Sequence, residues 1–286
     1  MINSYGFIGL GEMGKPIATN LLKSSKKLTV YDIDDLENKA PKGSFIAKSL
    51  DQLVSVSEII FISVPDGKAS SNVINNILNS NEKLVRHIIN LSTIGLQETK
   101  PLIEALNKVN ISYIDAPVSG GKSGAINATI TIMWSGSQKL LDEIRDDLDY
   151  FSKSIFFVGK EPGQGQIMKL INNYLSAVAM SSTSEAILLG LKNNLDMETM
   201  LNVLNVSTGK NSATLDKFPN RILTESYDAA FRMSLMNKDL ELYLSEAISN
   251  GMPIKIAKVV KNYFQEGEKS LPLGDFTEIY KVIKKI

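Results

Sequence analysis

The sequence contains no cysteine and only one histidine, His87, in 286 residues. Without cysteine there can be no disulfide, thiol nucleophile, thiolate metal site or iron–sulfur cluster, and one histidine excludes a multi-histidine metal site. We therefore expect no bound metal. Neither sign of charge is in excess, because Lys plus Arg and Asp plus Glu each number 31. Proteins that bind nucleic acid or anionic membranes usually carry an excess of Lys and Arg, so we expect neither partner.

Long hydrophobic segments are also scarce. No segment combines the positive start, apolar run and small-residue cleavage site of a signal peptide. The charge-free stretch 170–184 is interrupted by Asn, Ser and Thr and is shorter than the roughly 20 apolar residues that span a bilayer. The composition, with 43% hydrophobic and 22% charged residues, is ordinary for a globular protein. These features predict a cytoplasmic protein.

The hydrophobic pattern divides the chain into two parts. Up to about residue 160, short apolar runs alternate with amphipathic stretches, which is typical of a parallel sheet covered by helices on both faces. From residue 166 onward the pattern is helical and predicts no strand. At roughly 150 residues per domain, we expect a Rossmann-type α/β domain over residues 1–161 and an all-helical domain over residues 162–286. The predicted strands are 5–9, 28–32, 59–64, 87–90, 113–116, 130–134 and 155–158, and the predicted helices include 15–23, 69–78, 97–110, 238–250 and 254–266.

A glycine-rich segment follows the first predicted strand. Glycines at positions 9, 11 and 14 match the pattern G-x-G-x-x-G, in which they permit a tight turn while the next helix offers free N–H groups to a pyrophosphate. Asp32 ends the second predicted strand, where its carboxylate can accept hydrogen bonds from ribose hydroxyls. No Arg follows closely to hold a 2′-phosphate. The combination predicts an NAD site, with NADP as a second possibility; a glycine-rich turn with a solvated Asp is the alternative.

Lys169 is the only charged residue between Glu161 and Glu185. Asn172 and Asn173 follow it by three and four residues, so the three side chains share one helix face. Burial of an ammonium lowers its pKa toward the range in which an acid–base catalyst works. We therefore interpret Lys169 as a proton donor and acceptor. A lysine that reaches solvent from the end of a helix is the alternative.

Two further features deserve a functional interpretation. His87 stands at the start of a predicted strand, whereas ligands of open α/β sheets bind at the carboxyl ends, so we expect a surface or structural role.

Ser119 is followed by Gly120 and Gly121 after another predicted strand. A hydroxyl next to two glycine N–H groups suits a carboxylate, although a simple loop explains the same residues.

Together these motifs resemble the β-hydroxyacid dehydrogenases, a family that includes 3-hydroxyisobutyrate dehydrogenase, tartronate semialdehyde reductase and the glyoxylate/succinic semialdehyde reductases. The resemblance covers nearly the whole chain and is carried by residues 7–14, 90–93, 115–121, 163–173 and 235–240. It implies an NAD(P)-dependent oxidoreductase that moves a hydride between nicotinamide and a small β-hydroxyacid or its semialdehyde, with 3-hydroxyisobutyrate as the type of substrate. It also implies a homodimer or homotetramer. Ala128 and Ser135 depart from the family pattern, since they stand where glycines are usual, and so does Ala69, where some members have Asn.

The resemblance also implies roles for individual residues. Lys169 would be the catalytic acid–base. The substrate carboxylate and hydroxyl would be held by Ser119, Gly120, Gly121 and Asn173. The dinucleotide would be lined by Phe7, Ile8, Gly9, Leu10, Gly11, Glu12, Met13, Gly14, Asp32, Val64, Pro65, Thr93 and Lys238.

Two other functions are compatible with the same scaffold. Imine reductases of this fold generally carry another residue at the position of Lys169, so its presence argues against that activity. A protein that binds dinucleotide without turnover would not need the pair Lys169 and Asn173. The larger 6-phosphogluconate dehydrogenases share the fold, but this chain is far shorter and has no His near Lys169, which disfavours their substrate.

Overall fold

The computed structural model describes residues 2–34 and 36–285. The chain divides into two compact units, Met1–Lys169 and Leu170–Ile286. The first unit contains two clusters of buried apolar side chains, and the second unit contains a cluster of its own.

The first unit is built on one sheet, which has nine strands in the described residues. These are β1 Ser4–Ile8, β2 Lys27–Tyr31, β3 Phe45–Ile46, β4 Ile59–Ile62, β5 His87–Asn90, β6 Ser112–Asp115, β7 Val118–Ser119, β8 Ile130–Ser135 and β9 Ser152–Gly159. The order β3-β2-β1-β4-β5-β6 is parallel throughout and is that of the Rossmann fold. Strand β8 then runs antiparallel to β6 and β7 and parallel to β9. The predicted, mostly parallel sheet is confirmed.

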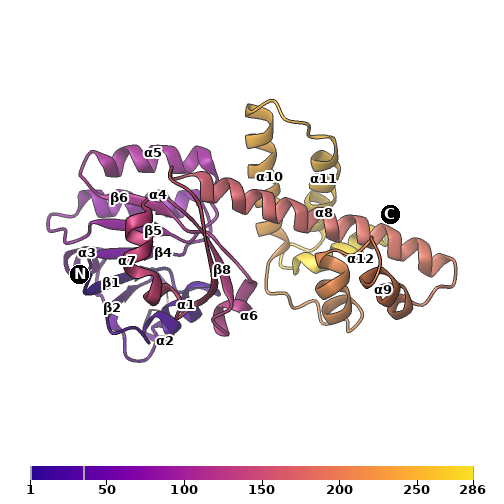
Figure 1. The fold of residues 1–286 in the computed structure, drawn as a ribbon, viewed down its shortest axis with the longest axis horizontal. Coiled ribbons are helices and arrows are strands. Elements are labelled where there is room, and N and C mark those ends of the chain that lie inside the picture. Colours follow the sequence, from indigo (N-terminus) through magenta and orange to yellow (C-terminus); the bar gives the residue numbers. More distant parts are fainter. Residues whose placement is uncertain (1, 35, 286) are drawn as a thin grey trace. The chain divides into compact units, whose positions relative to one another are not determined.

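Helices cover both faces of this sheet (Figure 1). They are α1 Gly14–Leu21, α2 Leu36–Lys39, α3 Leu50–Val56, α4 Gly67–Asn79, α5 Leu96–Asn107, α6 Gly121–Ile126 and α7 Gln138–Leu148. Helix α1 packs beside α6, and α4 contacts both α3 and α5. Successive side chains of a strand point to opposite faces, so Phe7 and Phe61 join one core and Ile8 and Ile62 the other. Burial on both faces explains why these strands read as continuous apolar runs.

Some elements of the first unit were not predicted. Strands β3 and β7 and helices α2, α3 and α6 are too short to show a period clearly. Helix α7 is different, because Leu140, Leu141, Ile144 and Leu148 are buried at helical spacing. Its start is capped by the Ser137 hydroxyl, which accepts a hydrogen bond from the Leu140 N–H. The pattern that predicts α7 is therefore present in the sequence.

The second unit is helical, as expected. Its elements are α8 Gln164–Lys192, which begins in the first unit, α9 Met197–Asn205, the π-helix η1 Ala213–Ile222, α10 Met233–Ser249, α11 Lys255–Ser270, the 3-10 helix η2 Phe276–Glu278 and α12 Ile279–Ile283. Among its described residues the β pairing is limited to an isolated bridge between Arg232 and Asp275. The helices of this unit, α10 and α11 among them, are visible in Figure 1.

Helix α8 has 29 residues and, by length and composition alone, would be able to cross a membrane. It is longer than the charge-free stretch considered from the sequence. A core helix of a folded domain passes the same test, and Ala177, Met180 and Ile187 of α8 are buried among apolar side chains of the second unit. Packing against the second unit accounts for part of the apolar composition of this helix, while Ile171, Leu175 and Leu189 are exposed.

Candidate active site

The glycine loop joins β1 to α1 and is held by the backbone of its neighbours. Gly9 has φ +93°, and a Cβ atom on it would lie 2.1 Å from the carbonyl oxygen of Ser63. A Cβ atom on Gly14 would lie 1.9 Å from the carbonyl oxygen of Gly9. The N–H of Gly9 donates a 3.0 Å hydrogen bond to the carbonyl oxygen of Tyr31. These two glycines are therefore required by the protein's own close packing.

Gly11 is different, because a Cβ atom on it would meet nothing within 4 Å. None of the described residues excludes a side chain here, so the space beside Gly11 is open to a ligand. The first turn of α1 contains no acidic residue, and its N-cap residue Met13 makes no side-chain cap. Within this turn Lys15 already donates its N–H to the carbonyl oxygen of Gly11 at 3.1 Å, and Pro16 has no N–H. The positive end of the helix dipole still attracts anions. The loop therefore fits the pyrophosphate of a dinucleotide.

Asp32 lies directly beside the glycine loop. Its Oδ2 accepts a 2.5 Å hydrogen bond from the N–H of Leu10, and its Oδ1 accepts one of 2.9 Å from the N–H of Asp34. Lys39, the last residue of α2, places its Nζ 3.7 Å from Asp32 Oδ1 and 3.1 Å from Asp34 Oδ2. Sequence reasoning looked only for Arg and missed this cation. A lysine beside the carboxylate weakens the repulsion that a 2′-phosphate would meet there.

A buried polar network holds the loops after β4 and β5. The side chain of Asn90 is fully buried and donates a 3.0 Å hydrogen bond to the hydroxyl of Tyr113. Its Oδ1 accepts a 3.0 Å bond from the N–H of Ser92, whose hydroxyl accepts a 2.9 Å bond from the N–H of Val64. Asn90 and Ser92 thus have structural roles, and they fix the loops that carry Val64 and Thr93.

The second glycine-rich segment leads from Ser119, the last residue of β7, into helix α6. Gly120 has φ +133° and Gly121 has φ +63°, conformations that residues with a side chain rarely adopt. The following residue, Lys122, forms an ion pair with Glu12 of the glycine loop. This contact, which the sequence did not reveal, connects the segment with the predicted substrate residues to the segment with the predicted cofactor residues.

Lys169 is buried, with 8% of its surface exposed, so it is not a lysine that extends into solvent. It lies in the second turn of α8, and Asn172 and Asn173 occupy the next turn. In the second unit, the amide of Asn173 donates a 2.5 Å hydrogen bond to Asp239 Oδ2. Asp239 is buried as well, and the Nζ of Lys238 lies 3.2 Å from its Oδ1. The structure thus brings the predicted residues Asn173 and Lys238 together through Asp239, which sequence reasoning had not singled out.

His87 is the first residue of β5 and lies at the opposite end of that strand from Asn90. Its Nδ1 is 2.5 Å from the hydroxyl oxygen of Ser112. Burial lowers the pKa of His87, which keeps the ring neutral at neutral pH. The structure agrees with a structural role for this residue, away from the carboxyl ends of the strands.

The predicted residues of the first unit follow the carboxyl ends of neighbouring strands, where such sheets bind ligands. Phe7 and Ile8 differ from the other predicted residues because they lie within β1. Their side chains are buried in the two cores, and Phe7 stacks on Phe61. The residues that follow strands β1, β2, β4, β5 and β7 are Gly9, Leu10, Gly11, Glu12, Met13, Gly14, Asp32, Val64, Pro65, Thr93, Gly120 and Gly121.

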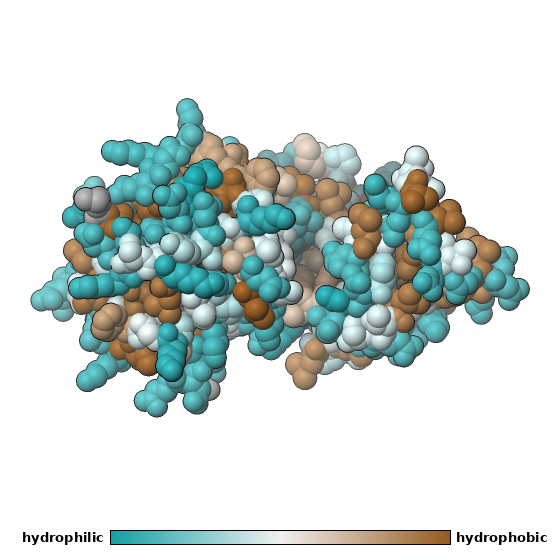
Figure 2. Space-filling view, turned by 60° about the horizontal axis from the view of Figure 1, so that its bottom comes forward, coloured by the Kyte–Doolittle hydropathy of each residue, from teal (hydrophilic) through white to brown (hydrophobic). Residues whose placement is uncertain are grey.

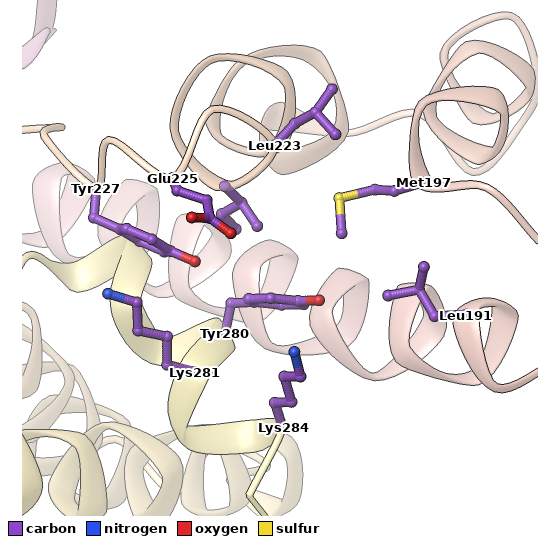
Figure 3. A pocket seen from close by; sticks show the side chains of 9 residues that line it. Leu191, Met197, Leu223, Glu225, Tyr227, Tyr280, Lys281 and Lys284 are labelled. Atoms are coloured by element: carbon purple, nitrogen blue, oxygen red, sulfur yellow. The ribbon is translucent and has the colours of Figure 1, made fainter.

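A cavity of about 530 Å³ lies within the second unit (Figure 3). Leu191 and Met197 lie toward one end, and Tyr227 and Lys281 toward the other (Figure 3). The Nζ of Lys281 lies 3.7 Å from the centre of the Tyr227 ring. None of the site residues predicted from the sequence lines this cavity.

Comparisons with known proteins agree with the fold and the glycine loop. Residues 4–159 match the family described as the NAD binding domain of 6-phosphogluconate dehydrogenase, and residues 163–283 match that described as NAD-binding of NADP-dependent 3-hydroxyisobutyrate dehydrogenase. The chain is 33% identical to 2-(hydroxymethyl)glutarate dehydrogenase of Eubacterium barkeri over 97% of this chain and 93% of the relative. It is 31% identical to 3-hydroxyisobutyrate dehydrogenase of Pseudomonas aeruginosa over 97% of both chains.

Solved structures show the same architecture. A Mycobacterium tuberculosis 3-hydroxyisobutyrate dehydrogenase with L-serine superimposes with a TM-score of 0.90 at 24% identity, over 99% of both chains. Imine reductases are more distant, for example that of Streptomyces aurantiacus with a TM-score of 0.63 at 19% identity, over 98% of this chain and 99% of that chain.

The fold and the loop define a dinucleotide-binding oxidoreductase. The chain belongs to the β-hydroxyacid dehydrogenase family, as its motifs suggested. It is accordingly an NAD(P)-dependent enzyme of the hydroxyacid dehydrogenase class.

Proposed function

We propose that this enzyme oxidises a small β-hydroxyacid of the 3-hydroxyisobutyrate type, or reduces the matching semialdehyde, with Lys169 as the acid–base. The observation that carries the proposal is the burial of Lys169, the single charge in an otherwise uncharged stretch of α8. A buried ammonium on the same helix as Asn173 is suited to exchange a proton with one substrate oxygen.

Proton transfer and substrate binding are assigned to different residues of the chain. When bound, the nicotinamide accepts or supplies the hydride. Lys169 takes the proton from the substrate hydroxyl during oxidation and returns it during reduction. Asn173, whose amide is held by Asp239, binds the same end of the substrate, while Ser119 and the N–H groups of Gly120 and Gly121 bind its carboxylate. Proton transfer of this kind typically contributes 10²- to 10⁴-fold, about 3–5 kcal/mol of barrier.

The dinucleotide would lie along the carboxyl edge of the sheet. Its pyrophosphate would contact the loop at Gly11 and the first turn of α1, and its ribose would contact Asp32. Phe7 and Ile8 would act through their backbone, because their side chains are buried. Residues 1–161 would form the dinucleotide-binding domain, and residues 162–286 would carry Asn173 and the further cofactor contact Lys238.

The relatives suggest which substrates to test. They are named for 2-(hydroxymethyl)glutarate, 3-hydroxyisobutyrate, L-serine and 2-hydroxy-3-oxopropionate. The first three carry a primary hydroxyl on the carbon β to a carboxylate, and the fourth has an aldehyde at that place. A substrate with this arrangement matches a site that has one acid–base and a separate carboxylate cradle.

The decisive experiment changes Lys169. With 3-hydroxyisobutyrate, L-serine and 2-(hydroxymethyl)glutarate as substrates and NAD as cofactor, we expect Lys169→Ala to lower turnover at least 10²-fold. The NAD dissociation constant should stay within twofold. Lys169→Arg should restore little, because guanidinium stays protonated and cannot accept a proton.

Lys192→Ala is the matched control, since Lys192 is an exposed lysine at the end of the same helix. It should keep wild-type turnover. Lys169→Ala with most of its activity retained, or with an activity loss that follows a loss of helical circular dichroism, would contradict the proposed role. Reduction of a cyclic imine in preference to every hydroxyacid and semialdehyde would favour the imine reductase activity instead.

We further propose that the enzyme is a cytoplasmic homodimer or homotetramer. Large apolar side chains of the second unit, including Leu189, Val203, Val206 and Leu273, are exposed. Brown hydrophobic side chains also interrupt the teal surface in Figure 2. Burial of these side chains against a second copy would remove them from water. Light scattering should give a mass of at least twice 31.4 kDa; a mass of one chain would refute the oligomer.

A further inference from the structure

A buried carboxylate at the end of β6 is connected to the start of α8. Asp115 has no exposed surface. Its carboxylate accepts hydrogen bonds from the N–H of Gly163, from the hydroxyl of Ser135 at 3.0 Å, and from the amide of Gln166 at 3.4 Å. These partners are backbone or neutral side chains. Burying a carboxylate is costly even when it is hydrogen-bonded, so a role beyond stability is expected for Asp115.

The hydrogen bonds converge on the first turn of α8, which cannot cap itself. The first N–H groups of a helix have no partner within it and are usually satisfied by a Ser, Thr, Asp or Asn at the N-cap. The residue before α8 is Gly163, which has no side chain. Asp115 supplies the missing acceptor from another strand, and the hydroxyl of Ser135 accepts a 2.9 Å bond from the N–H of Gly165.

Gln166 extends the same network to the loop after β5. Its Oε1 accepts hydrogen bonds of 2.8 Å from the N–H of Ile94 and 3.1 Å from that of Gly95. Its Nε2 donates a 3.0 Å bond to the carbonyl oxygen of Ser92. The first turn of α8 is thus tied to the ends of β5, β6 and β8, which fixes its position along the helix axis and its rotation about that axis.

Lys169 follows Gln166 by three residues, so it lies about 4.5 Å further along the axis and on the same side of the helix. A shift of the first turn therefore moves the ammonium by a similar amount. We propose that Asp115 and Ser135 are positioning residues, which hold the first turn of α8 so that Lys169 meets the substrate oxygen. This inference rests on the proposed acid–base role of Lys169.

Ser135 is the neutral side chain through which this arrangement can be tested. An alanine at this position could neither donate to Asp115 nor accept from the N–H of Gly165. The hydroxyl of Ser135 thus adds one hydrogen bond between β8 and β6 and one between β8 and α8.

The test compares Ser135→Ala and Asp115→Asn with two controls of the same chemistry. Ser152 is a buried serine of the same unit that donates to the carbonyl oxygen of Leu148, and Asp147 accepts from the hydroxyl of Tyr5. Turnover, KM for the best hydroxyacid of the panel, and the NAD dissociation constant are measured for Ser152→Ala and Asp147→Asn alongside the two positioning variants.

We expect kcat to fall three- to tenfold in Ser135→Ala and at least tenfold in Asp115→Asn, because a displacement of about 1 Å at a catalytic group can cost up to 10²-fold. KM and the NAD dissociation constant should stay within twofold. The controls should keep wild-type kcat. Amide hydrogen exchange of residues 163–166 should be faster in both positioning variants and unchanged in the controls.

The outcomes separate this inference from the proposed function. If Lys169→Ala is inactive while Ser135→Ala and Asp115→Asn keep wild-type kcat, the positioning role is wrong and the acid–base role stands. If Lys169→Ala stays active, the acid–base role is wrong, and the positioning role with it. If Asp115→Asn does not fold, Ser135→Ala decides alone, and a loss confined to KM or NAD binding also refutes positioning.

Discussion

Replacement of Gly11 by alanine tests the cofactor site most directly, because the structure separates the needs of the protein from those of the ligand at this position. A Cβ atom on Gly11 meets nothing within 4 Å, and its φ lies outside the left-handed region. Gly11→Ala should therefore fold normally and be more stable by about 0.4–1 kcal/mol, since alanine restricts the unfolded chain. The added methyl group occupies the space through which a pyrophosphate must approach the backbone N–H groups, so NAD binding should weaken.

The size of the expected effect follows from hydrogen-bond geometry. An N–H···O bond needs about 2.9–3.0 Å between heavy atoms, and a methyl group on the loop holds a phosphate oxygen farther away. Loss of one or more such bonds to an anion costs about 1.5–3 kcal/mol each. We therefore expect the NAD dissociation constant to rise at least tenfold, as 1.4 kcal/mol corresponds to a factor of ten. Isothermal titration with NAD and urea unfolding followed by circular dichroism measure the two effects.

Gly9→Ala is the matched control, because its methyl group would meet the protein rather than the ligand. It would lie 2.1 Å from the Ser63 carbonyl oxygen with φ at +93°, and the left-handed conformation alone costs about 1–2 kcal/mol. Gly9→Ala should lower the urea midpoint, whereas Gly11→Ala should not. A folded Gly11→Ala enzyme that binds NAD as tightly as the wild type would refute the placement of the pyrophosphate at this loop.

Three further predictions concern single side chains. His87→Gln should change kcat/KM less than about threefold, under 1 kcal/mol, because His87 lies at the wrong end of β5; an inactive variant would mean that the site has been misplaced. The enzyme should have a higher kcat/KM with NAD than with NADP, and Lys39→Ala should increase that ratio by at least roughly two- to fivefold, the range of surface ion pairs, since Lys39 and Asp32 are partly buried. Equal efficiency with both cofactors would refute the role of Asp32. Burial raises the pKa of Asp115 from 3.8 to about 6, so the folded state favours its protonated form by up to about 3 kcal/mol. That stabilisation is complete below pH 3.8 and lost as the pH rises through about 6, so the unfolding free energy of the wild type relative to Asp115→Asn should fall between pH 4 and pH 8 in urea titrations, and a constant difference would contradict it.

The sequence determined most of the architecture of the first unit. The apolar runs at β1, β4 and β5 are continuous because both faces of these strands are buried. An uninterrupted apolar run can be recognised from neighbouring residues alone. The glycines at 9, 11 and 14 and the acid at Asp32 follow the strands at the spacing that the Rossmann fold requires. Lys169 could be selected as a candidate catalytic residue from the sequence, because it is the only charge in a long uncharged stretch.

Some local patterns were present but were not used. Helix α7 has a buried face at helical spacing and a serine cap, which are signals in the sequence itself. Lys39 follows Asp32 on a short helix, so a search for any cation rather than for Arg would have found it.

Contacts between distant segments could be decided only by the tertiary structure. Asp115, Ser135 and Gln166 come from β6, β8 and α8, and their hydrogen bonds join residues up to 74 positions apart. Asn173 meets Asp239 across 66 positions. Whether a polar residue binds a ligand, caps a helix or supports another side chain depends on what the folded chain places within about 3 Å of it. The residue pattern along the chain predicts which face of a helix or strand is buried, because burial repeats with the local period. It does not predict which distant side chain completes a hydrogen bond, because that depends on how the segments pack in the folded chain.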